Sequence, residues 1–365
     1  MIVRLLPAAG LALLILVTAP AMGRIRDLLF EMFPGGAVKG LAIVLGGLLV
    51  TSLVACALKI RRHVGLRWLG LIAVVILLAL QITGFSHDNP RVDIVERIHI
   101  LQYGSLALLL YWALRPCRDL RLLLIPVLAG ALIGTLDETV QWLAPKRVGE
   151  IRDVAMNVVA AFTGLLFAVV IEPPRDFRWR LGKTGWRAVS WTAAAAVLTA
   201  GLFFDAAHLG YRIVDPEVGS FLSWRSEDEL RAAAIDRAER WATKPADKEA
   251  VWGIADTFRT EAGWHVSHRE GASHRELWAM AGRANQILER WYAPFLDFED
   301  HRWEDWKIEK GNTIAAEQTN PSTYRSPVLE HRIIVWPKGP VRAAWGSIAA
   351  LLAILPFILE RRSKR

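Results

Sequence analysis

Long apolar stretches, separated by short basic segments, dominate the chain up to residue 205 and return near the C-terminus. A helix that crosses a membrane needs about 20 predominantly apolar residues. This pattern predicts eight spans, of which the first three and the last two have the cleanest apolar runs. The predicted spans are residues 3–22, 37–58, 66–84, 98–114, 122–143, 154–171, 187–205 and 341–359.

Residues 206–340 interrupt the apolar pattern with polar, amphipathic sequence. Ser226 and Glu229 have the spacing of a capping box, which marks the start of a helix. After Pro294, short runs that contain Trp and Ile predict strands. The elements expected in this insert are helices at 226–243, 246–268 and 272–292, strands at 303–308 and 332–336, and a polar loop at 311–327.

Composition agrees with an integral membrane protein that has a sizeable polar part. Hydrophobic residues make up 53% of the chain and charged residues 22%, which excludes a disordered chain, and two cysteines exclude a disulfide-rich scaffold. The expected fold is an all-α polytopic membrane protein with about eight transmembrane helices and a mainly helical insert with a small β part. Its domains are expected to be a seven-span membrane domain at 1–205, the insert at 206–340, and a last transmembrane helix with a basic tail at 341–365.

Basic residues are divided unequally between alternate connections. The second, fourth and sixth connections and the C-terminus hold 16 Lys and Arg residues, whereas the first, third and fifth connections hold 8. Since cytoplasmic loops of membrane proteins are enriched in Lys and Arg, we predict a cell-membrane protein with both termini in the cytoplasm and an extracytoplasmic insert. The insert has a net charge of −4 and the remainder +12. The basic surplus therefore belongs to membrane loops, and no nucleic-acid partner is expected.

The first apolar run has a second interpretation. Arg4 precedes it, and Ala19-Pro20-Ala21 provides the small residues of a signal-peptide cleavage site. The run is long for a signal peptide, so a retained anchor is favoured. Cleavage would leave seven spans in the same orientation.

Polar residues recur inside the fourth, fifth and sixth spans, where ionisable groups are costly and mark functional sites. Their spacing places them on shared helix faces, because residues three or four apart are neighbours on a helix. By the predicted topology, these three faces lie near the outer membrane surface. The pairs are His99 with Tyr103, Glu138 with Gln141, and Asp153 with Asn157.

Together with Pro145, Arg147 and Gly164, these pairs resemble the motif order of the VanZ-like family over about residues 95–168. The resemblance implies a bacterial cell-envelope membrane protein with a VanZ-like core at 95–171. The family's namesake is linked to low-level resistance to the glycopeptide antibiotic teicoplanin. The expected polar pocket consists of His99, Tyr103, Glu138, Gln141, Arg147, Asp153 and Asn157.

Several functions are compatible with this pocket. The first hypothesis is binding or modification of a membrane lipid or a lipid-linked cell-wall precursor. The second is a membrane-embedded hydrolase or transferase acting on a lipid-linked phosphate, and the third is a structural protein whose insert binds a partner. No catalytic residue is assigned, because no catalytic motif is recognisable.

Structural roles compete with these functions. An ion-pair network that locks the helices would also explain Glu138, Arg147 and Asp153. Asp137 fits a position that only faces the membrane interface. Gly130-x-x-x-Gly134 fits a helix-packing face. His99, Glu138 and Asp153 are also compatible with a divalent metal. In the insert, His265, His268 and His274 are compatible with zinc, but no clear fourth ligand accompanies them. We therefore expect no metal and no cofactor.

Overall fold

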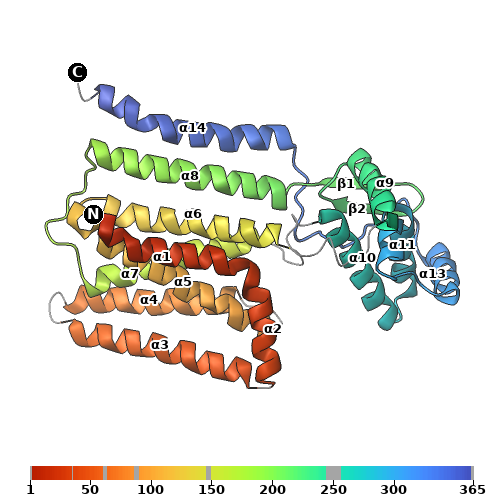
Figure 1. Ribbon diagram of the computed structural model, residues 1–365, viewed down its shortest axis with the longest axis horizontal. Coiled ribbons are helices and arrows are strands. Elements are labelled where there is room, and N and C mark those ends of the chain that lie inside the picture. Colours follow the sequence, from red (N-terminus) through yellow and green to blue (C-terminus); the bar gives the residue numbers. More distant parts are fainter. Residues whose placement is uncertain are drawn as a thin grey trace. The chain divides into compact units, whose positions relative to one another are not determined.

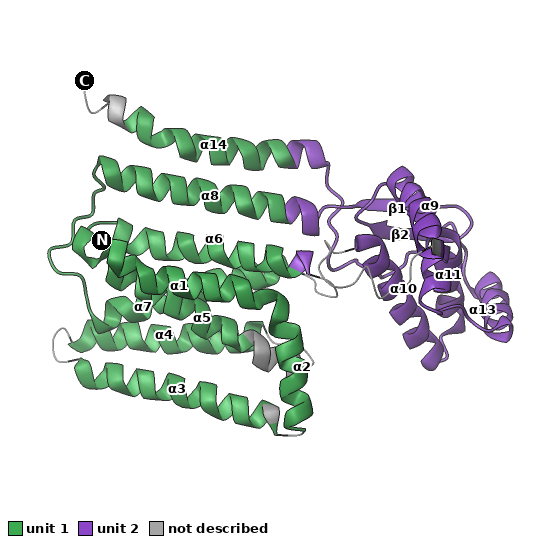
Figure 2. Cartoon of the chain, viewed as in Figure 1, with its two compact units in different colours: residues 1–141, 149–203, 342–365 green, residues 142–148, 204–341 purple. Residues whose placement is uncertain are grey.

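The computed structural model describes residues 2–34, 36–60, 64–85, 90–144, 149–243 and 256–362. The chain divides into two compact units (Figure 2). We call the first, residues 1–141, 149–203 and 342–365, the membrane unit. We call the second, residues 142–148 and 204–341, the insert unit.

Long helices lying side by side build the membrane unit (Figure 1). Short 3-10 turns at Ala19–Ala21 and Arg115–Cys117 follow α1 and α5. Helix α2 runs at an angle to the others (Figure 1). The helices are α1 (Ile2–Thr18), α2 (Met22–Met32), α3 (Ala37–Lys59), α4 (Val64–Gly84), α5 (Pro90–Leu114), α6 (Arg121–Leu143), α7 (Ile151–Ile171), α8 (Lys183–Ala207) and α14 (Lys338–Arg362).

The helical membrane fold expected from the sequence is confirmed. Among the described residues, seven helical segments are long and apolar enough to cross a membrane, and each coincides with one predicted span. The remaining predicted span, residues 98–114, is the fourth along the chain and lies within α5, which has 25 residues and packs against α7 and α1. Both termini, the turn between α5 and α6 and the loop between α7 and α8 lie at one end of the unit (Figure 1). The side of the membrane that this end faces stays a prediction.

Helix α7 packs directly against α4, α5 and α6, and small residues make these contacts possible. At Gly164 an added Cβ would lie 2.2 Å from the backbone oxygen of Gly104 on α5. At Gly130 on α6 it would lie 2.4 Å from the Cβ of Ala161. The packing role predicted for Gly130 and Gly134 is therefore confirmed, since both glycines face α7.

The described residues of the insert unit form a β-hairpin and five helices. Strands β1 (Tyr211–Asp215) and β2 (Gly219–Ser223) pair antiparallel, with Tyr211 opposite Ser223. A core of aromatic and aliphatic side chains joins the hairpin to the helices that follow. The helices are α9 (Glu227–Thr243), α10 (Thr257–His274), α11 (Trp278–Trp291), α12 (Ala293–Phe298) and α13 (Asp305–Gln318).

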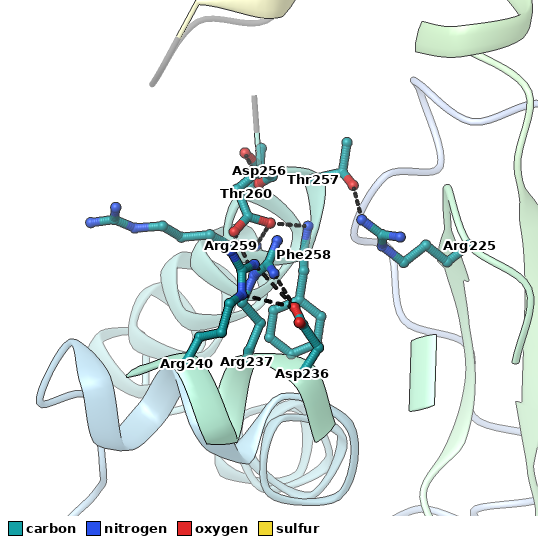
Figure 3. Close-up of polar contacts among 9 residues, drawn as sticks. All are labelled: Arg225, Asp236, Arg237, Arg240, Asp256, Thr257, Phe258, Arg259 and Thr260. Atoms are coloured by element: carbon teal, nitrogen blue, oxygen red, sulfur yellow. Dashed lines mark hydrogen bonds and ion pairs between the residues drawn. The ribbon is translucent and has the colours of Figure 1, made fainter. Parts of the chain in front are cut away.

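Polar contacts define where α9 and α10 begin. The capping box is formed, since Ser226 N–H donates to Glu229 Oε2 at 2.8 Å and Glu229 N–H donates to Ser226 Oγ at 3.4 Å. Asp256 caps α10 by accepting from the N–H groups of Phe258 and Arg259 (Figure 3). The same carboxylate pairs with Arg237 of α9 at 2.8 Å. One acidic residue thus caps a helix and ties it to its neighbour.

Several elements predicted in the insert are wrong. Helix α13 occupies residues 305–308 of the expected strand at 303–308 and residues 311–318 of the expected loop at 311–327, and residues 332–336 contribute only an isolated bridge at Ile334. Gly311 looks like a loop residue, but its backbone oxygen would lie 2.2 Å from a Cβ at Gly282, so it lets α13 approach α11. Trp303, which belongs to the expected strand at 303–308, is instead a buried residue before α13, and the Arg269 guanidinium lies over its ring.

We expect Gly164→Ala to destabilise the membrane unit by about 1–3 kcal/mol, because the new methyl group would meet the backbone of α5 rather than a movable side chain. Gly46→Ala on α3 is the matched control, since nothing lies within 4 Å of its added Cβ. Thermal unfolding of both variants in detergent measures the difference. Equal unfolding temperatures would contradict the close packing of α5 and α7.

Candidate functional site

Two helices of the membrane unit bring a buried acid against an aromatic pair. On α5, His99 and Tyr103 are four residues apart and their rings stack with centroids 6.0 Å apart. The fully buried Tyr103 hydroxyl donates to Asp137 Oδ2 on α6 at 2.9 Å. His99 Nδ1 lies 3.7 Å from the same oxygen. The predicted face of α5 is therefore directed at α6, although its acidic partner is Asp137.

Glu138, the next residue on α6, has no exposed surface. Gln141 Nε2 donates to its Oε1 at 3.2 Å, so the predicted pair on this helix is formed. The backbone N–H of Glu150, just before α7, donates to its Oε2 at 3.1 Å. Both carboxylate oxygens are thus held, one by the same helix and one by the segment that leads into the next.

Asn157 of α7 is the residue of the predicted pocket with no hydrogen bond from its side chain. It is fully buried, and neither its Oδ1 nor its Nδ2 has a partner among the described residues. Its side chain lies against Gly134, where an added Cβ would be 3.2 Å from Nδ2. Gly134 is one helical turn before Glu138, so the amide lies one turn from the two acids along α6. We call His99, Tyr103, Asp137, Glu138, Gln141 and Asn157 the polar cluster.

The remaining predicted pocket residues differ in what the structure shows. Asp153 is partly buried in the first turn of α7, four residues before Asn157. Its neighbour Arg152 donates to the backbone oxygen of Phe85 and lies over the Phe85 ring. Pro145 and Arg147 lie outside the described residues, so the network of Glu138, Arg147 and Asp153 stays a prediction.

The sequence pattern did not predict that Asp137 belongs to the pocket. Its side chain is 3% exposed and bonded to Tyr103, whereas the sequence also fitted a position that only faces the interface. One signal was available: Asp137 is four residues before Gln141 and three after Gly134, which places all three on the face of α6 that meets α7.

A metal-ligand arrangement is present within the polar cluster. One ligand atom each from His99, Asp137 and Glu138 lies within 4.8 Å of the other two. Imidazole and carboxylate ligands suit divalent transition metals. The triad considered from the sequence included Asp153, and the structure instead assembles these atoms with Asp137. Residues of the polar cluster also offer hydrogen-bond acceptors and donors to a polar ligand.

Comparisons with known proteins identify this part of the chain. The model of a family described as VanZ/LLP1 matches residues 73–172, which run from within α4 through α7. This segment is VanZ-like. It contains the whole polar cluster and extends beyond the residues 95–168 that suggested the resemblance. No curated protein and no solved structure matches the chain.

The insert unit contains a second buried polar group outside the VanZ-like segment. Glu261 of α10 is fully buried and accepts hydrogen bonds from Ser223 Oγ, the Trp224 N–H and the Tyr292 hydroxyl at 2.7–2.9 Å. Burial raises the pKa of Glu261 to about 7 despite these donors. One turn further, His265 is buried between the rings of Phe221 and Tyr292.

The zinc interpretation of the insert histidines gains no support. Burial lowers the pKa of His265 to about 3 and also lowers the pKa of His268. Neither ring nitrogen of His265 has a hydrogen-bond partner. Among the described residues, no group of three metal-ligating side chains gathers in this unit. The ring of His265 therefore acts as an aromatic core residue.

Glu261 predicts a pH dependence that Glu261→Gln should remove. A carboxyl group whose pKa is higher in the folded than in the unfolded protein stabilises the fold at low pH, and this contribution is lost as pH rises from about 4.5 to about 7. Glutamine stays neutral at every pH. The unfolding free energy of the Glu261→Gln variant, relative to that of wild type, should therefore increase by about 3 kcal/mol between pH 4.5 and pH 8. His265 has the opposite effect, because its lowered pKa reduces stability as pH falls below about 6.5. This effect is present in both proteins, so it cancels when the variant and wild type are compared at the same pH.

Thermal unfolding followed by tryptophan fluorescence measures this difference, because nine of the 16 tryptophans lie in residues 206–340. Asp228→Asn, at an exposed position of α9, is the control and should track wild type at every pH. A constant offset between Glu261→Gln and wild type from pH 4.5 to pH 8 would show that Glu261 is not the titrating group.

Proposed function

We propose that the polar cluster of the VanZ-like segment binds the head group of an envelope lipid or a lipid-linked cell-wall precursor. The chain would act in a bacterial cell membrane, with an effect on sensitivity to glycopeptide antibiotics. The observation on which this rests is the Asn157 amide, which is buried and has no hydrogen-bond partner in the described part of the chain. An unsatisfied buried polar group costs about 1–3 kcal/mol. A ligand that bonds to the amide would recover that cost.

The charges of the polar cluster favour one kind of head group. Asp137 and Glu138 present two buried carboxylates, which accept hydrogen bonds from hydroxyl groups and repel a bare phosphate. Asn157 and His99 provide polar atoms beside them. A hydroxyl-rich head group, such as a sugar or glycerol, is therefore the better fit to the described residues, with the acyl chains outside the bundle.

Asn157→Leu separates a binding role from a structural one. Replacing an unbonded buried amide by an apolar group of similar size is neutral or stabilising, so the ligand-free protein should unfold at the same temperature as wild type or higher. Lipidomic analysis of the purified variant should at the same time show loss of the co-purified lipid. Retention of that lipid, or a clearly lower unfolding temperature, would contradict the proposal.

The matched control removes a buried polar pair elsewhere on α7. Gln81 Nε2 on α4 donates to Thr163 Oγ1 at 2.8 Å. Thr163→Val should reduce stability, because it leaves Gln81 without this acceptor, and should leave lipid retention unchanged.

His99→Gln addresses the catalytic alternative. If it keeps the lipid but abolishes the cellular phenotype, the cluster acts on the lipid chemically as well as binding it.

The proposed topology places the insert outside the cytoplasm. Gly271→Cys tests it, because this glycine lies in the last turn of α10, rather than in the expected break between helices, and an added Cβ there meets nothing within 4 Å. The variant should react with an impermeant thiol reagent in intact cells. Gly182→Cys, in the exposed loop before α8, should react only after lysis. The native Cys56 and Cys117 are buried. If Gly182→Cys reacted in intact cells and Gly271→Cys only after lysis, the protein would have the opposite orientation in the membrane.

A further inference from the structure

A basic pocket of about 530 Å³ lies in the membrane unit, at the end where α6 and α8 begin. One wall is the turn that contains Asp119 and Arg121, and the other is the segment 178–185. The Arg178 N–H donates to the Arg118 backbone oxygen at 2.8 Å, and Arg118 pairs with Asp176 at 3.2 Å. These contacts hold the two walls together, so the pocket is a built feature of the fold.

The pocket has a large excess of positive charge. Its one acidic residue, Asp119, is matched by Arg121, whose Nε and Nη2 donate to Oδ1 and Oδ2 at 2.9 and 2.8 Å. Burial alone would raise the pKa of Asp119, but the hydrogen bonds from Arg121 outweigh it and keep that pKa below its usual value. The charge of Arg178 also lowers this pKa, so Asp119 stays ionised, and its hydrogen-bonded ion pair is with Arg121.

Three further cations of the pocket form no ion pair with an acidic residue in the described part of the chain. Arg178, Arg180 and Lys183 are exposed, and none of them forms an ion pair with a described residue. Lys183 also begins α8, whose first backbone N–H groups have no acceptor within the helix and add positive potential at the same place. Such an arrangement fits an anion with several oxygen acceptors.

The position of the pocket indicates where the anion comes from. Trp179, which also lines it, has 75% of its surface exposed. Tryptophan concentrates at membrane–water interfaces, where its ring lies among lipid head groups. Helix α8 continues from the pocket as an apolar span with exposed side chains such as Leu198 and Leu202. A lipid with its phosphate in the pocket would therefore have apolar surface for its acyl chains.

We infer that this basic pocket binds the phosphate of an anionic membrane lipid through Arg178, Arg180 and Lys183. These three cations lie in the loop before α8 and at its first residue, away from the residues of the polar cluster, and they recognise negative charge, whereas the cluster presents two carboxylates. Basic pockets between membrane helices bind anionic head groups, and Lys and Arg residues near an anionic membrane surface attract it.

Native mass spectrometry of the purified full-length protein with added lipids tests the inference. Phosphatidylglycerol should bind roughly ten- to hundred-fold more tightly than phosphatidylcholine. The triple variant Arg178→Gln/Arg180→Gln/Lys183→Gln should lose this preference. Arg4→Gln/Arg24→Gln/Lys39→Gln removes the same charge from exposed positions outside the pocket and should keep it. In an Asn157→Leu background, where the polar cluster no longer contributes to binding of the glycerol head group, a preference should remain that the further pocket substitutions remove, which separates this site from the polar cluster.

Equal loss of preference in both triple variants would overturn the inference, because the effect would then come from overall charge. No loss in the pocket variant would overturn it as well. Inorganic phosphate provides the third arm: if it binds as tightly as phosphatidylglycerol, the ligand is a free anion and not a lipid. Should the triple variant fail to fold, Arg180→Gln alone must weaken phosphatidylglycerol binding measurably, and unchanged binding would reject the site.

Discussion

The approach of α7 to α5 and α6 is the constraint on which the membrane unit depends. Lipid gives no hydrophobic force between helices, so membrane helices associate through close packing, and small residues allow it. Gly104 meets Gly164 where α5 and α7 cross, and Gly130 and Gly134 meet Ala161 and Asn157 where α6 and α7 cross. A side chain on Gly130, Gly134 or Gly164 would meet α7 or α5 at 2.2–2.8 Å, and relieving that contact would move apart the polar groups that the helices present.

The polar cluster follows from this packing. Once the helices lie at contact distance, Tyr103 reaches Asp137, and the segment before α7 reaches Glu138. Burying carboxylates is costly unless they are hydrogen-bonded, and here each has at least one donor. The Asn157 amide departs from this rule. Among the described residues, both polar atoms of the Asn157 side chain lack a hydrogen-bond partner, and the proposal of a binding pocket rather than a structural lock rests on this amide.

Sequence reasoning succeeded where a pattern had a single physical meaning. Apolar length located seven candidate spans, and the spacing of Glu138 and Gln141 gave a pair that the structure forms. It failed where a residue's role depends on a partner far along the chain. Gly311 resembles a loop residue until Gly282 is known to face it, and Trp303 resembles a surface residue until Arg269 and Trp278 cover it. Asp137 was underestimated for the same reason, since Tyr103 is 34 residues away.

The account depends most on the contact between α5 and α6 at Tyr103 and Asp137. A double-mutant cycle with Tyr103→Phe, Asp137→Asn and the double variant measures it through unfolding free energies in detergent. If the hydrogen bond joins the helices as described, the single changes should not add, and the coupling energy should be about 1–2 kcal/mol. Additivity within about 0.5 kcal/mol would mean that the two side chains act independently. The polar cluster would then not exist as one site.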